Sequence, residues 1–589
     1  MGPSDELVED KPTKYVHSRV LEYDVSEWPP FPIAFAVAFQ HVMFCLGTVV
    51  TVTYIVSDVV CISPNDPIRS QIFCSSLFMV GLATITQTLL GVRLPVFQGP
   101  SFTFLPPLLA MKSSGTWTCP LNNTENQPNI MNTTLNVLSY VDENTKYNRL
   151  NELQGSLILA SLVEVLLGAT GAVGILQGVI GPITIAVTIF LLGFSLYPVS
   201  ILYSNSYWPI AIMSALIVII AGVYLAHVKV KLPGCPWRSK SKTDTSPKAY
   251  HLFNIFAIPL SILLTWIICF VCTRMGLFPT DPTKSAYMAR TDTRTELIES
   301  TPWFHWPYPG QFGAPKFNLG LFIAFISVSI SSAMESIGDY LATGKTCDAL
   351  PVPAHAVNRG ILIEGLMSVL SAFFGTGHAT TSYSVGASIV TLTKVGSRYA
   401  VLLSGVLALI LAVFVKFGAV MSSMPDPIIG GIAMATTGII IGLAISTLRT
   451  VDMTSSRNIS VVGISIFIPI ICSETLNRYP NMINTGNTEL DKVVELVLSF
   501  PMILGTFIAL VMDNTVKGDR HSRGLLPIIN DGNFDVEQNA VQLCPASRHV
   551  SRSHLYDVPY LDKLCKDNVT LRRIPFIQNI GHTRKCEAV

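Results

Sequence analysis

The sequence predicts an all-α polytopic membrane protein with fourteen transmembrane segments, and three observations lead to this prediction. The 589 residues are 50% hydrophobic and only 13% charged, whereas soluble domains carry about 25% charged residues. The hydrophobic residues gather in runs, most of which are long enough to cross a hydrocarbon core of about 30 Å. Two shorter runs, the third and the tenth, are interrupted by Gly, Pro, Ser and Thr.

The apolar runs form a transmembrane domain, residues 31–515, between two polar tails, 1–30 and 516–589. The N-terminal tail has no basic region followed by a short apolar run, so we expect no cleavable signal peptide. The C-terminal tail is mildly basic, and we expect it to be disordered and to contact anionic membrane lipid. The expected segments are 32–60, 72–91, 94–111, 153–177, 179–199, 207–227, 250–273, 317–338, 357–375, 379–393, 399–418, 427–448, 459–475 and 494–513.

The third and tenth segments differ from the others. Arg93 to Leu109 is broken by Gly and Pro, and Phe374 to Arg398 is rich in Ser, Thr and Gly. Hydrocarbon cannot satisfy such backbone and hydroxyl groups, so these stretches are buried in protein or line a polar cavity. Interrupted segments at corresponding positions of two halves of seven indicate the substrate site of a transporter with inverted repeats. A Gly- and Ser-rich cytoplasmic loop is the alternative interpretation of 374–398.

Loop charges and sequons predict the orientation. The loop after the sixth segment, 227–249, carries six basic residues against one acid, which is typical of the cytoplasmic side. The loop after the third segment instead contains N-glycosylation sequons at Asn122 and Asn132, which predict an extracellular position. We therefore expect a plasma-membrane protein with both termini in the cytoplasm. The loop 274–316 and the cysteines at 61, 74 and 119 are then near the outside, where a disulfide is possible without a readable pairing.

Ionisable and polar side chains within apolar segments are the functional candidates. Glu335 and Asp339 are four residues apart in the eighth segment and share one helix face. Asp339 is alternatively a helix-end group at the cytoplasmic surface. Gln40 and His41 interrupt the first segment, where a buried His more often bonds to neighbouring protein groups than to a substrate.

Two further ionisable residues fall within apolar segments. Glu164 lies in the fourth and Lys416 in the eleventh, and both are open to a structural role at a helix end or in a pair. No P-loop, zinc signature or nucleophile elbow occurs in the sequence, which argues against an ATP-driven pump and against an enzyme. No nucleic-acid partner is expected.

Seven motifs occur in a characteristic order, and they are AMESIGDY, HAVNRGILIEG, GTG with TKVGSR, MPDPIIGG, VDMTSSRN, INTG and MDNT. Together they resemble the nucleobase–ascorbate transporter family, and its animal sodium-dependent vitamin C transporter branch most of all. The resemblance covers about 32–524 and implies two inverted repeats of seven segments, with a short strand and a half-helix in segments three and ten. It implies a core domain of segments 1–4 and 8–11, a gate domain of segments 5–7 and 12–14, dimers through the gate domains and an elevator movement.

The resemblance also implies functional residues. The family's substrate-binding glutamate matches Glu335, its downstream polar position matches Asp339, and its Gln-His pair matches Gln40 and His41. Backbone groups that bind substrate at the third half-helix match Ser101 and Phe102.

The family's signature motif is altered in segment ten. Val385, Gly386 and Ser388 stand where the motif has Gln, Glu or Pro, then Asn, and then Gly. In an alternative register Ser384 replaces the Asn, but TKVGSR is then unmatched. The candidates to replace the missing donors are the hydroxyls of Ser382, Ser384 and Ser388 and the phenol of Tyr383.

The sequence therefore predicts a secondary active transporter that couples sodium to a small polar substrate, either ascorbate or a nucleobase, and that needs no other cofactor. An anion exchanger or channel of the same architecture is one alternative. A non-transporting member with a decayed site is another.

Overall fold

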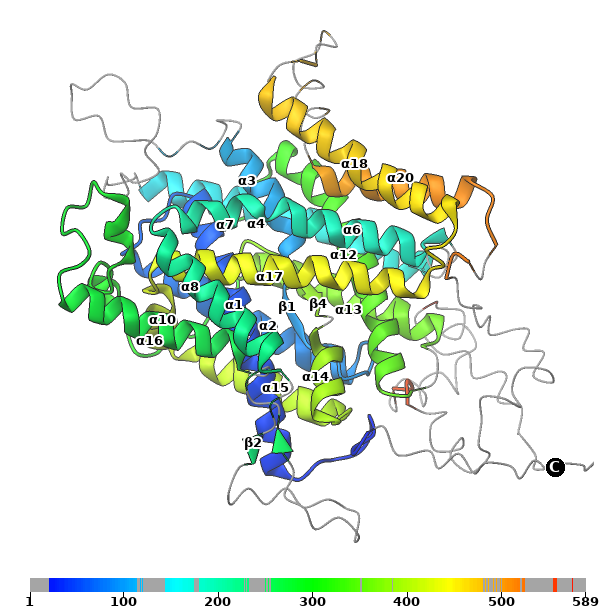
Figure 1. Ribbon diagram of the computed structural model, residues 1–589, viewed down its shortest axis with the longest axis horizontal. Coiled ribbons are helices and arrows are strands. Elements are labelled where there is room, and N and C mark those ends of the chain that lie inside the picture. The colour runs from blue at the N-terminus through cyan, green and yellow to red at the C-terminus, as the bar shows by residue number, and fades with distance from the viewer. Residues whose placement is uncertain are drawn as a thin grey trace, which may run out of the picture.

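A computed structural model describes residues 21–113, 143–173, 179–226, 256–349, 352–383, 385–479 and 500–519, with several shorter stretches between and after them. Within these residues nine helices are long and apolar enough to cross a membrane, and a helix pair bent by 85° makes a tenth if it is counted as one span. Figure 1 shows a bundle whose long helices mostly follow the long axis of the molecule. The predicted class, a helical polytopic membrane protein, is confirmed. The predicted total of fourteen includes interrupted segments that are too short to count as spans by themselves.

The helices follow the predicted apolar runs. Those of the first half are α1 (Phe31–Val59), α2 (Pro67–Leu89), α3 (Leu105–Ser113), α4 (Glu143–Thr170), α6 (Pro182–Ser195), α7 (Tyr197–Ser204), α8 (Trp208–Ile219) and α10 (Ala257–Arg274). Those of the second half are α11 (Thr295–Ser300), α12 (Leu319–Thr346), α13 (Ala354–Phe373), α14 (Val385–Thr393), α15 (Arg398–Val413), α16 (Val415–Ser422), α17 (Asp426–Thr447), α18 (Ser456–Arg478) and α20 (Pro501–Thr515).

Short elements complete the described chain. Four short turns of helix are η1 (Phe102–Phe104), η2 (Ile220–Tyr224), η3 (Ser285–Ala289) and η4 (Leu448–Thr450). Four strands form two antiparallel pairs, β1 with β4 and β2 with β3. They are β1 (Gln98–Pro100), β2 (Val230–Lys231), β3 (Ala249–Tyr250) and β4 (Thr380–Ser382).

Local chemistry explains where several helices begin. The side chain of Asp66 accepts a hydrogen bond from the Ile68 backbone N–H at the start of α2, and Asn318 accepts one from Leu321 at the start of α12. These side chains satisfy amide groups that have no partner inside the helix. Proline occupies the first turn of α1, α2, α6, α7, α8, α17 and α20, where its missing N–H costs no helical hydrogen bond.

The helices pack in two groups. In the first, α4 lies along α13, α2 lies along α15, and α1 also packs on α15. In the second, α17 packs against α6, α7 and α8, and α20 packs against α6 and α18. The β1–β4 pair contacts α1, α2, α12 and α13 of the first group. This arrangement buries both strands completely within the described protein.

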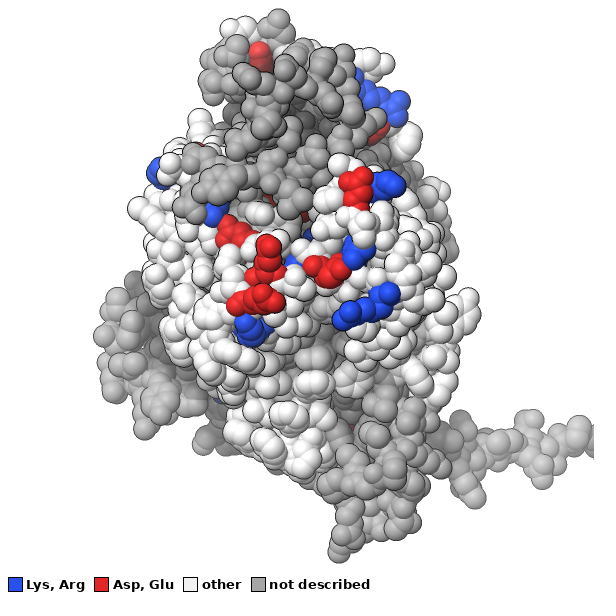
Figure 2. All heavy atoms as spheres, turned by 90° about the vertical axis from the view of Figure 1, so that its left-hand side faces the viewer, with Lys and Arg blue, Asp and Glu red and all other residues white. Residues whose placement is uncertain are grey.

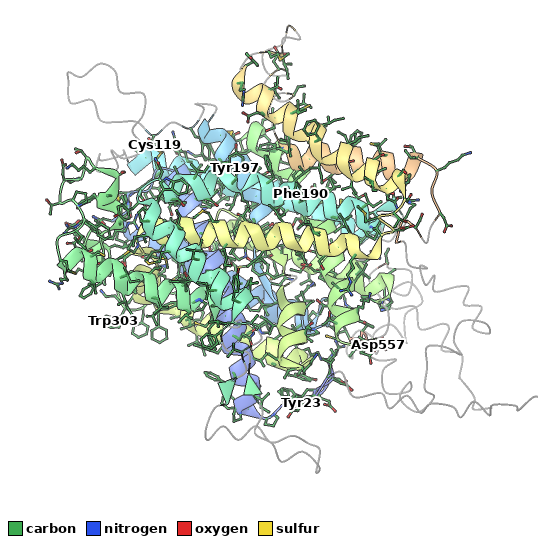
Figure 3. The ribbon with its side chains drawn as sticks, in the orientation of Figure 1. Tyr23, Cys119, Phe190, Tyr197, Trp303 and Asp557 are labelled. Atoms are coloured by element: carbon green, nitrogen blue, oxygen red, sulfur yellow. A yellow bond between two sulfur atoms is a disulfide. The ribbon has the colours of Figure 1, made fainter. Side chains whose placement is uncertain are left out.

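One end of the bundle is fastened by a disulfide and by ion pairs. Cys61 and Cys119 form a disulfide, which the sequence left unassigned, whereas Cys74 is a buried free thiol. Figure 2 looks onto this end and shows acidic and basic side chains gathered near its centre. Cys119 and Trp303 lie towards this end and Asp557 lies towards the other (Figure 3). The predicted glycosylation sites, 122 and 132, lie outside the described residues.

Two predicted boundaries were wrong. Helix α4 begins at Glu143, ten residues before the expected start at 153, because its polar first turns are held by contacts such as Lys146 Nζ to Asp66 Oδ2 at 2.6 Å. The expected eleventh segment is not continuous, since α15 and α16 meet at an 85° bend. There Lys416 Nζ donates hydrogen bonds to the carbonyls of Ile298 and Thr301, so this lysine has a structural role.

The C-terminal tail is ordered at one point where disorder was expected. Residues 555–558 are buried against the first helix group. Arg359 Nη2 donates to the Tyr556 carbonyl at 2.6 Å, and Arg398 Nη1 donates to the Leu555 carbonyl at 3.3 Å. Two arginines thus hold the tail backbone, and the prediction of a wholly disordered tail was wrong for these residues.

Candidate functional site

The site is built around the antiparallel pair β1–β4. The register places Gln98 opposite Ser382 and Pro100 opposite Thr380. Two further backbone hydrogen bonds lengthen the pairing. Ser101 N donates to the Ala379 carbonyl at 2.9 Å, and Tyr383 N donates to the Phe97 carbonyl at 3.0 Å. Because the strands run in opposite directions and each leads into a short helix, α3 and α14 start from opposite ends of the pair. The helix dipoles give both N-termini a partial positive charge, which favours an anion or a carbonyl oxygen.

The Tyr383 side chain, which follows β4 in the tenth segment, contacts strand β1 of the third segment. Its hydroxyl donates to the Pro100 carbonyl at 2.9 Å. Its ring lies directly over Gly99, where an added Cβ would come within 2.2 Å of the ring. Gly99 is therefore required for this aromatic ring to reach the strand opposite, and substitution there displaces Tyr383.

Two carboxylates of α12 face this region in different ways. Asp339 is buried and accepts a hydrogen bond from Ser382 Oγ at 3.2 Å, so it holds the end of β4. The alternative of a surface helix-end group is wrong for Asp339. Glu335 is half-buried, makes no hydrogen bond among the described residues, and lies within electrostatic range of Tyr383. Glu335 is thus the carboxylate of this pair that remains free to accept hydrogen bonds from a ligand.

Glu364 of α13 belongs to the site and was not singled out from the sequence. It accepts hydrogen bonds from Ser336 Oγ at 2.5 Å, from Tyr340 Oη at 2.5 Å and from the Ser382 backbone N–H at 3.1 Å. These bonds fasten α12 and β4 to α13. The signal was present in the sequence, because Glu364 is a lone acid within a twenty-residue apolar helix.

Gln40 and His41 lie on the same stretch of α1, and both are buried. His41 Nδ1 lies 2.8 Å from the Val37 carbonyl, which only accepts, so Nδ1 carries the proton and donates. His41 Nε2 has no hydrogen-bond partner among the described residues. The imidazole lies next to Phe97, with ring centroids 5.5 Å apart. His41 is therefore satisfied on one side and free on the side near β1.

The third-segment candidates, Ser101 and Phe102, directly follow strand β1. Ser101 is buried and its hydroxyl lies 2.5 Å from Thr103 Oγ1. The Ser101 N–H is taken by Ala379, so it is not free for a ligand. The short helix that begins at Phe102 has no side-chain cap, which leaves the first N–H groups of this turn as candidate donors.

The tenth-segment candidates are described only in part. Ser384 lies outside the described residues, and the side chains of Val385 and Ser388 are likewise outside them, although both residues belong to α14. The Gly386 N–H donates to the Tyr383 carbonyl at 2.9 Å. An added Cβ at Gly386 would meet its nearest atom, Phe97 N, at 3.7 Å, which is an ordinary contact. Gly386 therefore has room for a side chain.

The described residues contain no cluster of three His, Cys, Asp or Glu side chains able to hold a transition metal. The polar groups that surround β4 are hydroxyls, carboxylates and backbone groups. Such hard oxygen donors suit a small hydrated cation or a polar organic ligand better than a soft metal ion.

Comparison with known proteins places the chain among membrane transport proteins. The profile of a permease family, Xan_ur_permease, matches residues 33–477. The chain is 36% identical over 503 residues to solute carrier family 23 member 2 of Homo sapiens, covering 85% of this chain and 76% of that protein. It is 34% identical over 506 residues to solute carrier family 23 member 1 of Rattus norvegicus, covering 86% and 82%. It is 28% identical over 508 residues to nucleobase-ascorbate transporter 1 of Arabidopsis thaliana, covering 85% and 90%.

Two solved structures resemble the chain at low sequence identity. The murine solute carrier 26 family member A9 anion transporter in the inward-facing state has a TM-score of 0.46 at 12% identity, covering 86% of this chain and 73% of that one. The transmembrane domain of the cyanobacterial bicarbonate transporter BicA has a TM-score of 0.41 at 10% identity, covering 81% and 97%.

Proposed function

Because the chain belongs to the nucleobase–ascorbate transporter family, whose members are membrane transporters and not enzymes, we propose that it is a secondary active transporter. In this proposal it couples the entry of sodium to the uptake of ascorbate or a nucleobase. It acts as a homodimer in the plasma membrane, with both termini in the cytoplasm.

The observation that carries the proposal is the free hydrogen-bonding capacity of Glu335 on α12, a helix that contacts both η1 and α14. The carboxylate accepts hydrogen bonds from N–H or O–H groups of a substrate, while the amide groups at η1 and α14 donate to its carbonyl or enolate oxygens. A small ring with donors on one edge and acceptors on the other fits both requirements. Ascorbate has such edges, and so do uracil and xanthine, whose rings carry both carbonyl and N–H groups.

The packing of the helices supports an elevator movement. The group formed by α1, α2, α4, α12, α13 and α15 surrounds the β1–β4 pair and contains the site. The group around α17 packs mainly within itself. In this proposal the first group is the core domain and the second is the gate domain that the family resemblance implies. Movement of the first group against the second carries the site across the membrane without dismantling the strand pair.

The substrate itself is decided by the tenth segment in this proposal. A Gln or Glu at position 385 would supply directional hydrogen bonds to a nucleobase edge, but Val385 supplies none. Recognition then depends on backbone N–H groups, which favour the ascorbate anion over a neutral base. Position 386 favours a nucleobase instead, because Gly386 replaces the Asn that the vitamin C branch has there. Ascorbate and a nucleobase therefore both remain candidates.

An anion exchanger of the same architecture is the alternative that the sequence analysis left open. Glu335 and Asp339 favour the symporter, since two carboxylates next to the substrate path disfavour an anion with no accompanying cation. The Glu364 carboxylate beside them strengthens this argument.

Uptake of radiolabelled ascorbate, uracil and xanthine into proteoliposomes tests the proposal. We expect saturable uptake of one compound with sodium outside, and at least tenfold less when choline replaces sodium. Uptake that is equal in sodium and choline would exclude sodium coupling. Exchange of bicarbonate or sulfate without uptake of any of the three ring compounds would favour the anion exchanger.

A further inference from the structure

Helix α4 carries a polar face that is buried among the helices of the first group. It packs antiparallel to α13, so that Gln154 lies against Gly375 and Glu164 lies against Gly365. Ser161 is seven residues after Gln154 and three before Glu164, which places all three side chains on one face of the helix. All three are buried within the described protein. None of them is used by the site around Glu335.

Glu164 is a deeply buried carboxylate of α4. Its side chain is 1% exposed, and neither of its oxygens accepts a hydrogen bond within the described residues. The Ser332 hydroxyl of α12 lies within hydrogen-bonding range of Glu164 and 3.4 Å from Thr381 Oγ1. Glu364 lies within electrostatic range of Glu164. A buried carboxylate with a second carboxylate nearby is costly unless a proton or a cation neutralises it.

Further oxygens without partners surround Glu164. The hydroxyls of Ser161 and Ser329 are buried and make no hydrogen bond within the described residues. Helices α4 and α12 run in the same direction, because Asn318 at the start of α12 bonds to residues 152 and 156 of α4 and Ser332, further along α12, lies beside Glu164, further along α4. One turn back from Glu164 on α4 is Ser161, and one turn back from Ser332 on α12 is Ser329. The two unpaired hydroxyls therefore face the same contact between helices.

The carboxylate of Glu364 needs no direct cation contact, but its charge adds to that of Glu164. Its hydrogen bonds all come from neutral donors, two side-chain hydroxyls and a backbone amide. Neither glutamate forms an ion pair among the described residues, whereas buried carboxylates are normally paired or bind a cation. A carboxylate with several hydroxyl oxygens is a donor set that suits a small hard cation.

We propose that Glu164, together with the hydroxyls of Ser161, Ser329 and Ser332, binds one sodium ion in the contact between α4, α12 and α13. The choice of sodium rests on the sodium-coupled transport proposed above. This site does not include Glu335.

Hydroxyl contacts connect this ion site to the substrate site. The Ser332 and Ser336 hydroxyls both lie near Thr381 Oγ1 of β4, at 3.4 and 3.1 Å. A sodium ion at Glu164 draws the Ser332 oxygen towards itself and leaves Thr381 to Ser336. Because β4 leads directly into α14, the ion stabilises one arrangement of the strand that presents the tenth segment to substrate. This is how ion binding and substrate binding favour each other.

Binding of radioactive sodium to the purified full-length protein, measured by scintillation proximity with choline as the competing salt, tests the site. We expect saturable binding to the unaltered protein and at least tenfold weaker binding to Glu164→Gln. The double change Ser161→Ala with Ser329→Ala removes two ligands and keeps the charge, so we expect binding about threefold weaker. The control is Glu474→Gln, which changes an exposed glutamate of α18 that pairs with Arg478, and it should bind as the unaltered protein does.

Unchanged sodium affinity in Glu164→Gln would overturn the proposal, as would the absence of saturable sodium binding to the unaltered protein. If Glu164→Gln does not fold, as shown by loss of its thermal transition, the double serine variant decides, and unchanged affinity in that variant overturns the site. The measurement uses no substrate. Failure to transport ascorbate, uracil and xanthine therefore refutes the proposed function and leaves this result standing.

Discussion

Buried charged side chains are paired at the charged end of the bundle, which holds the Cys61–Cys119 disulfide, but the glutamates in the middle of the bundle are not in ion pairs among the described residues. At the end, Arg69 pairs with Asp58 and Arg294 pairs with Asp426, and both arginines lie over the ring of Tyr54. In the loop beyond, a hydrogen bond from Arg290 lowers the pKa of Asp292 from its usual value. In the middle, the glutamates at 164, 335 and 364 have no ion pair among the described residues. The difference separates charges that hold the fold from charges that are available to ligands.

Breaking an ion pair at the charged end should give the largest loss of stability. Arg294→Met leaves Asp426 without its partner and removes hydrogen bonds to Tyr54 Oη at 2.8 Å and to the Met424 carbonyl at 2.5 Å. Removing one member of a buried pair costs about 3–5 kcal/mol, and we expect about 3 kcal/mol because Asp426 is partly exposed. Thermal unfolding of the purified protein measures this loss.

Arg478→Gln is the matched control, since Arg478 pairs with Glu474 on the exposed face of α18. An exposed pair of this spacing contributes about 0.3–0.5 kcal/mol. If Arg294→Met were no less stable than Arg478→Gln, the charged end would not be a structural element and the comparison would fail.

Changing the free carboxylate in the middle should leave stability nearly intact and reduce transport. Glu335→Gln removes the acceptor for substrate donors, at a cost of about 1–3 kcal/mol for neutral groups. Uptake should fall at least tenfold at equal amounts of surface protein, since about 1.4 kcal/mol corresponds to a factor of ten. The melting temperature should stay close to that of the unaltered protein, because Glu335 makes no hydrogen bond among the described residues. Near-normal uptake, or a large drop in melting temperature, would remove Glu335 from the site.

The tenth segment should control which substrate enters, with an effect of about tenfold on relative uptake. Val385→Gln with Gly386→Asn restores nucleobase-type donors and acceptors, so xanthine or uracil uptake should rise relative to ascorbate. Val385→Pro with Gly386→Asn should have the opposite effect. The space at Gly386, where the nearest atom lies 3.7 Å from an added Cβ, favours folding of both variants. Equal selectivity in two active variants would move specificity to the third segment, around Ser101 and Phe102.

The sequence predicted the features that depend on local pattern. The apolar runs, the interrupted third and tenth segments, and the shared face of Glu335 and Asp339 all follow from residue order and helical spacing. Contacts between distant segments could not be predicted in this way. The bonds from Ser336, Tyr340 and Ser382 to Glu364 join three elements whose pairing depends on tertiary packing.

Other differences also have tertiary causes. From the sequence, Glu164 could have been a helix-end group or a member of a structural pair. Only the packing of α4 on α13 shows that its side chain is buried and that its oxygens have no hydrogen-bond partner by distance among the described residues. The bend between α15 and α16 contains no proline, and Lys416 next to it bonds to carbonyls at the end of α11, more than a hundred residues earlier. The burial of residues 555–558 of the C-terminal tail likewise depends on hydrogen bonds from Arg359 and Arg398, which are distant in sequence.

The last prediction tests which side of the membrane the charged end faces, and it should change transport least. The Cys61–Cys119 disulfide lies at this end, and disulfides persist in the oxidising environment outside the cytoplasm. The sequons at Asn122 and Asn132 follow Cys119 in the chain. Changing both asparagines to Gln should therefore abolish a glycan-dependent mobility shift on a gel, with uptake unchanged per molecule at the surface. The control, Asn568→Gln, alters a sequon in the tail and should leave the shift intact. A shift that survives the double change, or that is lost in the control, would place the charged end in the cytoplasm and reverse the topology. The ion pairs would then face the cytoplasm and sodium would enter from the other end of the bundle.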